Sequence, residues 1–500
     1  MASATDPWDL LVVGGGTAGL VGAHTAARLG ARVALVERER TGGDCLWTGC
    51  VPSKALLAAA GRAADARRAA ALGVSVSGVT TDLEAVLAHV RSAIAAIEPA
   101  DSPDALREAG VHVLSGSARF TAPSSLEVRG PDSDVATLRF HQALVATGAA
   151  PGIPPVPGLA EVQPLTSETI WGLETLPYRL TVIGGGSTGC ELGQAFARLG
   201  ASVTIVEAGP RLLPGEDPDA SAVLRAALEH DGVEVLTGYR AISASGMKAG
   251  PGTVTVKGEG AERALEHDVL LVATGRRPRS GGLGLSHAGV ATNAAGFITV
   301  DATLRTSNPR IWAAGDVTAH QQLTHLAGVN GAVAASNAVL GLRRRAEVWG
   351  TPRVTFTDPE IAAVGSPTWV RGTATEPRTV TRRHTEVDRA IAEGRTDGFT
   401  RLALGRRGRV LGGTIVGPRA GESLAEITLA VRRGLTATDL AAIPHPYPTY
   451  GDGVWAPAVA VVEKRLAAPA TRRVTAALVA ARRSWAARTS PGKRIGRAHR

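Results

Sequence analysis

The chain has 500 residues and is rich in glycine and alanine, which predicts a globular protein of two to four domains and excludes a disordered one. No apolar run approaches the roughly 18 residues that span a bilayer, and the N-terminus lacks the pattern of a secretory signal. The cytoplasm is therefore the expected location. Three cysteines are too few for a disulfide scaffold.

The formal net charge of +9 is concentrated near one end of the chain. Eleven lysines and arginines, and no acid, lie between Lys464 and Arg500, so the first 463 residues carry a net charge of −2. The excess positive charge therefore belongs to a tail.

The first predicted element is a strand–helix–strand unit, DLLVVGGGTAGLVGAHTAARLGARVALVER, from Asp9 to Arg38. Gly14, Gly16 and Gly19 form G-x-G-x-x-G, which brings backbone N–H groups and a helix N-terminus to a pyrophosphate. Glu37 ends the second strand, where a carboxylate accepts hydrogen bonds from ribose hydroxyls. The unit predicts a dinucleotide site, with a plain strand–helix turn as the alternative.

The next stretch, GGDCLWTGCVPSK from Gly42 to Lys54, contains Cys45 and Cys50. A long helix is expected to run on from it, and the pKa of a thiol near a helix N-terminus is lowered. The two cysteines are thus placed to cycle between dithiol and disulfide. Unpaired thiols or half of a metal site are the alternatives, although no second cysteine pair or histidine cluster in the sequence completes a zinc site.

A second unit, RLTVIGGGSTGCELGQAFARLGASVTIVEA, repeats the first between Arg179 and Ala208. The glycine spacing recurs at Gly184, Gly186 and Gly189. Glu207 ends the second strand and repels a 2′-phosphate, so NAD is favoured over NADP, although Arg211 is close enough to compensate. Cys190 is expected to be a small buried hydrophobe. Two such units predict an α/β protein with two doubly wound nucleotide-binding domains.

Later motifs suggest how the chain is divided. ALVATGAAPGIPPVPG reads as a strand followed by an interdomain crossing, and LLVATGRRP and IWAAGDVT follow the second unit. From about Val354 the pattern changes to strands with short helices, including one near Ser423–Arg433, which predicts an α+β domain. The tail alternates Ala, Val and Arg, so part of it could form a basic amphipathic helix, while its Thr-Ser-Pro-Gly ending reads as frayed. The expected segments are 1–150 and 276–345 for the first domain, 151–275 for the second, 346–466 for the third, and 467–500 for the tail.

These motifs, in this order, resemble the class I pyridine nucleotide-disulfide oxidoreductases, which include dihydrolipoamide dehydrogenase, glutathione reductase and mercuric reductase. GGDCLWTGCVPSK matches the redox motif of that family, with Asp44 where threonine is usual. The resemblance extends from Asp9 to about Glu463. It implies a homodimeric enzyme with Rossmann-like FAD- and NAD-binding domains and a C-terminal dimerisation domain. Electrons would pass from NADH through FAD to a Cys45–Cys50 disulfide.

The resemblance also implies roles for single residues. Cys50 is the thiol against the flavin and Cys45 is the thiol that exchanges with substrate. Lys54, paired with Glu191, lies near the reactive nitrogen of the flavin, where an ammonium stabilises the negative charge that arrives with a hydride. Ordinary helix-surface charges are the alternative for this pair. The implied cofactor contacts are the two glycine turns with Glu37 and Glu207, Lys54, and also Gly43, Thr147, Gly148, Gly275, Gly315, Asp316, Leu323, Thr324 and His325.

The sequence departs from the family near its C-terminal motif, a His-Pro-Thr followed by Glu. In IPHPYPTYGDGVW, Tyr447 takes the histidine position and Asp452 the glutamate position. A phenol with a pKa near 10 is a poor base at neutral pH. His445 lies two residues earlier and, in an extended chain, points the same way about 6–7 Å away. Either His445 takes over through a shifted backbone, or no such proton relay is needed; His445 as a plain loop residue is the alternative.

The electron acceptor is left open. A low-molecular-weight disulfide is favoured, and a metal ion or a quinone are the alternatives. Mercuric reductase is similar in having tyrosine at this position, but its C-terminal cysteine pair is missing here. The tail is expected to be a solubilising extension, with no nucleic acid or membrane as partner, although weak binding to an anionic surface stays open.

Overall fold

The computed structural model describes residues 6–365 and 377–489. The chain divides into two compact units, with the boundary between Ile361 and Ala362. Within the described ranges, no helix is long and apolar enough to cross a membrane.

The first unit begins with a seven-stranded sheet. Six of its strands run in the order β3-β2-β1-β6-β5-β4, and β17 pairs with β6. The bounds are β1 (Trp8–Val13), β2 (Val33–Glu37), β3 (Val111–Ser115), β4 (Ser117–Ala122), β5 (Ser125–Arg129), β6 (Val135–Val145) and β17 (Ile311–Ala313). Strands β1, β2, β3, β6 and β17 are parallel, and β4, β5 and β6 form an antiparallel meander. The apolar run LLVV of β1 is buried, as parallel strands covered on both faces require.

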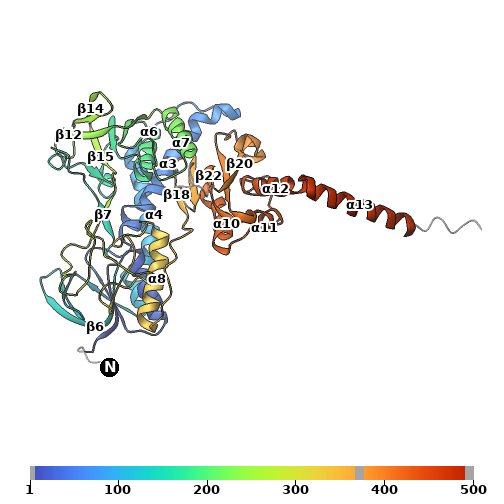
Figure 1. Ribbon diagram of the computed structural model, residues 1–500. Helices are drawn as coiled ribbons and strands as arrows, with labels where there is room; N and C mark the ends of the chain where they lie inside the picture. Colours follow the sequence, from blue (N-terminus) through green and yellow to red (C-terminus); the bar gives the residue numbers. More distant parts are fainter. Residues whose placement is uncertain (1–5, 366–376, 490–500) are drawn as a thin grey trace, which may run out of the picture. The chain divides into compact units, whose positions relative to one another are not determined.

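Helices from distant parts of the chain cover this sheet. Helix α1 (Thr17–Arg28) packs along α8 (Thr324–Leu340), which is yellow in Figure 1. Because β17 and α8 return to the first sheet, residues 311–340 complete the layer that residues 8–145 began. The remaining helices of this part are α2 (Gly43–Trp47), α3 (Cys50–Arg68), α4 (Leu83–Asp101) and α5 (Pro103–Glu108).

A second parallel sheet carries the repeat of the first unit. Its order is β11-β10-β9-β15-β8, with β12-β13-β14 as a separate antiparallel sheet. The bounds are β8 (Leu165–Thr166), β9 (Arg179–Ile183), α6 (Ser187–Leu199), β10 (Ser202–Glu207), α7 (Pro218–His230), β11 (Glu234–Thr237), β12 (Arg240–Gly246), β13 (Gly252–Lys257), β14 (Glu262–His267) and β15 (Val269–Val272). The two predicted doubly wound units are confirmed.

The glycine turns of the two sheets share the same hydrogen bond and the same backbone conformation at their first glycine. The Gly14 N–H donates to the carbonyl oxygen of Val36, and the Gly184 N–H donates to that of Val206, each at 2.8 Å. Gly14 has φ +104° and Gly184 has φ +115°, which side chains rarely allow, and a Cβ on Gly14 would lie 2.5 Å from the Ala146 carbonyl oxygen. The sequence repeat is thus a repeat of backbone geometry.

The predicted crossing segments lie side by side. Strand β7 (Ala149–Pro151) pairs antiparallel with β16 (Arg276–Pro278). ATGAAP and ATGRRP therefore form one ribbon where the chain leaves the first sheet and where it returns to it.

The strands of the second unit belong to the sheet β18-β19-β22-β21-β20, as the predicted α+β pattern requires. The boundary after Ile361 falls within β19, so β18 and the first two residues of β19 lie in the first unit. The bounds are β18 (Arg353–Thr355), β19 (Glu360–Val364), β20 (Arg378–Arg383), α9 (Asp388–Ala392), β21 (Phe399–Leu404), β22 (Val410–Gly417), α10 (Ala420–Arg433), α11 (Ala437–Ala441), α12 (Asp452–Leu466) and α13 (Pro469–Thr489). Part of the tail is thus a 21-residue helix, and most of its Thr-Ser-Pro-Gly ending, from Ser490, lies outside the described residues.

Candidate active site

The redox stretch folds as two helices joined by a tight turn. Cys45 lies in the short helix α2, and Cys50 is the first residue of α3. The turn is closed by the N–H groups of Thr48 and Gly49, which both donate to the carbonyl oxygen of Asp44. Both cysteines are free thiols, so the structure describes the dithiol form of the predicted pair.

Cys50 lies where two helices begin. Its Sγ is 3.2 Å from the Oγ1 of Thr324, the first residue of α8, and Cys50 itself opens α3. The sulfur therefore lies near the N-terminal ends of two helices, where partial positive charge favours a thiolate. The expected helix after the cysteines supplies only one of these ends.

The two thiols differ in acidity. A hydrogen bond from Cys45, one from Thr324 and the charge of Lys54 together lower the pKa of Cys50 to about 6, against burial and the charge of Asp44. The same bond, with burial, raises the pKa of Cys45. At neutral pH the pair therefore exists as a Cys50 thiolate that accepts a hydrogen bond from the Cys45 thiol.

Lys54 and Glu191 form the pair that the resemblance implied. The Lys54 Nζ lies 2.9 Å from the Glu191 Oε2, and the side chain of Glu191 is 7% exposed while that of Lys54 is 38% exposed. The other carboxylate oxygen accepts the N–H of Phe356 at 2.9 Å, and the Lys54 Nζ lies 4.3 Å from the centre of the Phe356 ring. A largely buried carboxylate with both oxygens bonded holds the ammonium in one place.

A buried charge network fixes the loop that carries Phe356. Arg198, on the same helix as Glu191, bonds Asp231 at 2.7 Å and Asp358 at 2.9 Å. Gln194 accepts the Asp358 N–H at 2.7 Å and donates to the Asp358 carbonyl at 2.7 Å. Helix α6 therefore positions both Glu191 and the backbone amide that Glu191 accepts.

Asp44, the departure from the family motif, pairs with a residue of the second crossing. The Nη2 of Arg276 bonds the Asp44 carboxylate and donates to the Ala149 carbonyl at 2.6 Å, while its Nε lies 3.4 Å from Asp316. Burial raises the pKa of Asp316 to about 6, with Asp44 adding to the effect and Arg276 opposing it. Arg276 thus joins the redox turn, the crossing ribbon and the AAGDVT loop.

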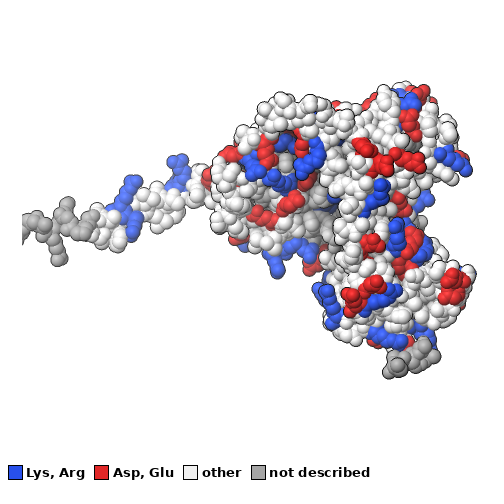
Figure 2. Space-filling model, turned by 180° about the vertical axis from the view of Figure 1, so that it is seen from behind, with Lys and Arg blue, Asp and Glu red and all other residues white. Residues whose placement is uncertain are grey.

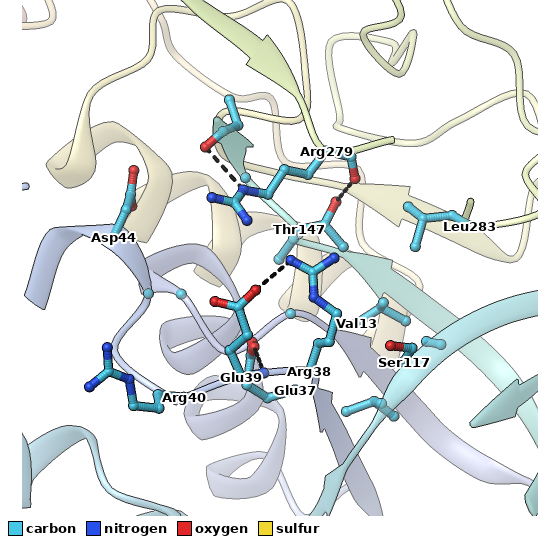
Figure 3. A pocket seen from close by; sticks show the side chains of 18 of the residues that line it. Val13, Glu37, Arg38, Glu39, Arg40, Asp44, Ser117, Thr147, Arg279 and Leu283 are labelled. Atoms are coloured by element: carbon cyan, nitrogen blue, oxygen red, sulfur yellow. Dashed lines mark hydrogen bonds and ion pairs between the residues drawn. The ribbon is translucent and has the colours of Figure 1, made fainter. Parts of the chain in front are cut away.

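A cavity of 520 Å³ opens at the first glycine turn. Figure 3 shows the side chains of Arg38, Arg40 and Arg279 around it, with Glu37 on its wall. The Oε2 of Glu37 accepts the Gly15 N–H at 2.6 Å, and Thr147 donates to the Arg279 carbonyl at 2.8 Å. The other predicted residues on this wall are Gly14, Gly16, Gly43 and Gly148.

The walls of this cavity fit a dinucleotide. A Cβ on Gly43 would lie 2.7 Å from the Gly16 Cα, so the close backbone approach there needs glycine at position 43. Gly16 caps the N-terminus of α1 without a side-chain bond, which leaves backbone N–H groups for a pyrophosphate. Three arginines line the cavity, two of them paired with Glu39 and Glu168, and the Glu37 carboxylate lies at the strand end where a ribose would bind.

A second cavity, of 870 Å³, opens at the second glycine turn. Gly184, Gly186, Glu207 and Gly275 line it, with Gln322, whose amide Nε2 is buried without a partner among the described residues. Gly189, like Gly19 in the first turn, packs against the carbonyl of the first glycine of its motif. An unpartnered amide donor is available to a polar ligand.

The remaining predicted residues lie around these features. Leu323 precedes α8, and the Nε2 of His325 lies 2.9 Å from the Pro352 carbonyl oxygen. Gly315 follows β17 with φ +78°. Cys190 is fully buried with its Sγ against the Gly185 carbonyl, as expected for a small core residue.

The C-terminal candidates do not form one cluster within the second unit. Both oxygens of Glu426 lie within 3.0 Å of the His445 Nε2, and the His445 Nδ1 lies 2.8 Å from the Ile443 carbonyl oxygen. Tyr447, 72% exposed, donates to Asp388, which raises its pKa. Asp452 accepts the Thr449 N–H at the start of α12. The sequence alignment placed Asp452 in the family dyad, whereas in the structure the histidine pairs with Glu426.

Several contacts were missed by sequence reasoning. Thr324 was predicted to contact the cofactor, but not to bond Cys50. Phe356, Arg276 and Glu426 were not named at all, although TDPEIAAVG and ATGRRP marked their neighbourhoods. Among residues 6–365 and 377–489, no group of three or more His, Cys, Asp and Glu side chains is placed to hold a metal ion.

Replacing Thr324 with valine is expected to move the thiolate titration of the reduced protein to higher pH. The hydroxyl bond stabilises the charged form of Cys50, so losing it raises the pKa by an amount on the order of one pH unit, the value of about 1.5 kcal/mol. A pH titration of the ultraviolet thiolate absorbance measures this. Thr324→Ser keeps the hydroxyl and should titrate like the parent; a valine variant that does so too would contradict the assigned bond.

Comparisons with known proteins agree with this geometry. Residues 8–336 match the family model described as pyridine nucleotide-disulphide oxidoreductase, and residues 351–457 match its dimerisation domain. The chain is 36% identical to a mercuric reductase of Streptomyces lividans, over 91% of this chain and 96% of that protein. It is 35% identical to a dihydrolipoyl dehydrogenase of Geobacillus stearothermophilus, over 89% of this chain and 94% of that protein.

Solved structures give the same result. The fold matches LpdA of Mycobacterium tuberculosis with a TM-score of 0.82 and 30% identity, covering 92% of this chain and all of that one. It also matches the Cu(II) complex of RclA, an HOCl-induced flavoprotein disulfide reductase of Escherichia coli, with a TM-score of 0.79 and 26% identity, covering 91% of this chain and all of that one. The chain therefore belongs to the pyridine nucleotide-disulphide oxidoreductase family, a family of FAD-dependent enzymes.

Proposed function

We propose that this enzyme uses NADH to reduce a low-molecular-weight disulfide through Cys45 and Cys50. The observation that carries the proposal is the Cys50 thiolate, which is stabilised by Cys45, Thr324 and Lys54 and lies beside a thiol that keeps its proton. One thiolate and one thiol in contact are the reduced form that thiol–disulfide exchange requires.

The cofactor would be held by residues already described. FAD bound in the 520 Å³ cavity would supply a hydride acceptor for NADH and a two-electron donor for the disulfide. The first glycine turn would bind its pyrophosphate, Glu37 its ribose, and Asp316 its ribitol. Lys54, held by Glu191, would keep a fixed positive charge beside the ring.

The exchange with substrate follows from the acidities of the two thiols. Cys45 attacks the substrate disulfide while its proton passes along the hydrogen bond to the Cys50 thiolate, so a mixed disulfide forms and one substrate thiolate leaves. The substrate thiolate that left then takes this proton from Cys50, which becomes a thiolate again. The Cys50 thiolate then attacks the Cys45 sulfur, which restores the disulfide and releases the second substrate thiolate to take a proton from water.

These exchange steps need no histidine base. They therefore favour the second alternative for the C-terminal motif, that no such proton relay is needed. Both ring nitrogens of His445 face acceptor oxygens, and its side chain is 9% exposed, so no nitrogen of the ring is available to a substrate. We assign His445 and Glu426 a structural role, and Tyr447 and Asp452 no part in the proton transfer.

The proposal is tested by adding NADH to the FAD-loaded enzyme without oxygen. At the two-electron stage a long-wavelength absorbance should appear, because the Cys50 thiolate would then lie against oxidised flavin. Absence of that absorbance, with the flavin reduced instead, would show that electrons do not reach the disulfide.

NADH is expected to be a better donor than NADPH, with kcat/KM higher by at least about tenfold, the factor for 1.4 kcal/mol. Glu207 lies where a 2′-phosphate would sit, and its oxygens already accept the N–H groups of Gly185 and Gly209 at 2.7 and 2.6 Å. Arg211, the residue able to compensate, bonds the Pro214 and Glu216 carbonyls instead. Glu207→Gln should narrow the difference; comparable rates with both nucleotides in the parent enzyme would contradict this assignment.

The second candidate acceptor is a soft metal ion. Tyr447 replaces the family histidine, and relatives named mercuric reductase are as similar to the chain as those named dihydrolipoyl dehydrogenase. A dithiol binds soft ions well. Parallel assays with lipoamide, glutathione disulfide, Hg²⁺ and a quinone would rank the acceptors.

Because residues 351–457 match the dimerisation domain, we also expect a homodimer, which light scattering of the purified protein would detect.

A further inference from the structure

Helix α13 (Pro469–Thr489) has no buried residue. Its large apolar side chains are exposed, with Val474 at 61%, Leu478 at 65% and Trp485 at 53%. Water-exposed aliphatic and aromatic side chains on one helix indicate a surface that a partner covers.

Four apolar residues of α13 form a stripe along one side of the helix, while Val479, 48% exposed, lies off this stripe. Val474, Leu478, Ala481 and Trp485 are spaced i, i+4, i+7 and i+11, which places them in a single stripe over about three turns. At 3.6 residues per turn, Arg472 and Arg483 fall on the opposite side, whereas Arg488 borders the stripe near the end of the helix. The helix therefore carries an apolar stripe that arginines border.

The charge of α13 has a single sign. It contains five arginines and no acid, and Figure 2 shows only blue and white atoms along it. The guanidinium of Arg482 lies 4.0 Å from the centre of the Trp485 ring, so a cation borders the apolar stripe. The first 463 residues, at −2, supply no comparable excess of negative charge.

We propose that α13 is a docking surface for an anionic lipid membrane, on which the helix lies in the plane of the interface. Trp485, Leu478 and Val474 would enter the boundary between headgroups and acyl chains, and the arginines would contact lipid phosphates. A nucleic acid would satisfy the arginines but leave the stripe in water. A second copy of the chain would cover the stripe but offers no excess of acid for the arginines.

The test uses the full-length enzyme and vesicles, and it does not depend on the redox proposal. The enzyme should sediment with vesicles of phosphatidylcholine mixed with phosphatidylglycerol at low salt. It should not sediment with phosphatidylcholine alone, and high salt should weaken the binding. Leu478→Asp should weaken binding by at least about tenfold. Ala480→Asp adds the same charge away from the stripe and is the matched control. It should weaken binding to the anionic vesicles clearly less than Leu478→Asp does.

Each other outcome would overturn the proposal. If the enzyme does not sediment with anionic vesicles, α13 is not a membrane-docking surface. If the two aspartate variants lose vesicle binding equally, α13 is attracted by charge alone and its apolar stripe does not insert. Retention of DNA without vesicle binding would assign α13 to nucleic acid. A change of oligomeric state in Leu478→Asp alone, measured by light scattering, would assign the stripe to a second copy. NADH-dependent activity of both variants confirms that they fold.

Discussion

Replacing Cys45 with serine is expected to lower kcat/KM for a disulfide substrate by at least about 10⁴-fold, as removal of a nucleophile does in other enzymes. Serine keeps a hydroxyl that donates a hydrogen bond to Cys50, so the Cys50 thiolate should persist. What is lost is the sulfur that attacks the substrate, because the Cys50 thiolate, with a pKa of about 6, is too weak a base to activate a hydroxyl. Steady-state assays with lipoamide and glutathione disulfide measure the effect.

Cys45→Ala is the matched variant for this result. It also lacks the attacking sulfur, but it donates no hydrogen bond, so the pKa of Cys50 should rise in Cys45→Ala and stay low in Cys45→Ser. NADH oxidation with a quinone serves as the internal control, since it shows that cofactor and nucleotide still react. Disulfide reduction that survives in both variants would refute the role of the thiol pair.

Lys54→Met is expected to slow reduction of the enzyme by NADH by about 100-fold, the usual effect of removing one group that stabilises developing charge. Methionine keeps much of the length and apolar contact of the lysine, including contact with the Phe356 ring, but has no ammonium. It also leaves Glu191 buried and unpaired, which should cost stability on the order of 2 kcal/mol, because Lys54 is partly exposed. Stopped-flow absorbance and thermal unfolding measure the two effects.

Glu191→Gln tests separately the charge of the Lys54 ammonium and how firmly that ammonium is held in place. Glutamine can still accept the Phe356 N–H through its amide oxygen, and the ammonium of Lys54 stays but loses its ion-pair partner. We expect a smaller loss of rate, about tenfold, since the charge remains while its placement loosens. If Lys54→Met reacts with NADH as fast as the parent enzyme, the pair is only a link between α3 and α6.

Motifs of this chain that depend on backbone geometry could be read from the sequence. The two glycine turns, their strands and the terminal glutamates were predicted at Gly14, Gly184, Glu37 and Glu207, because only certain residues permit those local conformations and close approaches. The helix after Cys50 and the buried state of Cys190 were predictable for the same local reasons.

Contacts between distant segments were decided only by the tertiary structure. Thr324 lies 274 residues from Cys50 in the chain, and Arg276 lies 232 residues from Asp44, yet each pair is in contact. Glu426, not Asp452, pairs with His445 because α10 brings its carboxylate to the loop after α11. A sequence pattern records which side chain stands at each position, but not which α-helix N-terminus or carboxylate the fold brings to it.

The sequence by itself determined the motifs that identify the family: two glycine turns, each between a strand and a helix, and two cysteines just ahead of a predicted helix. Only the tertiary structure decided which of the two thiols holds the negative charge. The acidity of a thiol depends on the few groups within hydrogen-bonding distance, and for Cys50 those groups come from α2, α3 and α8.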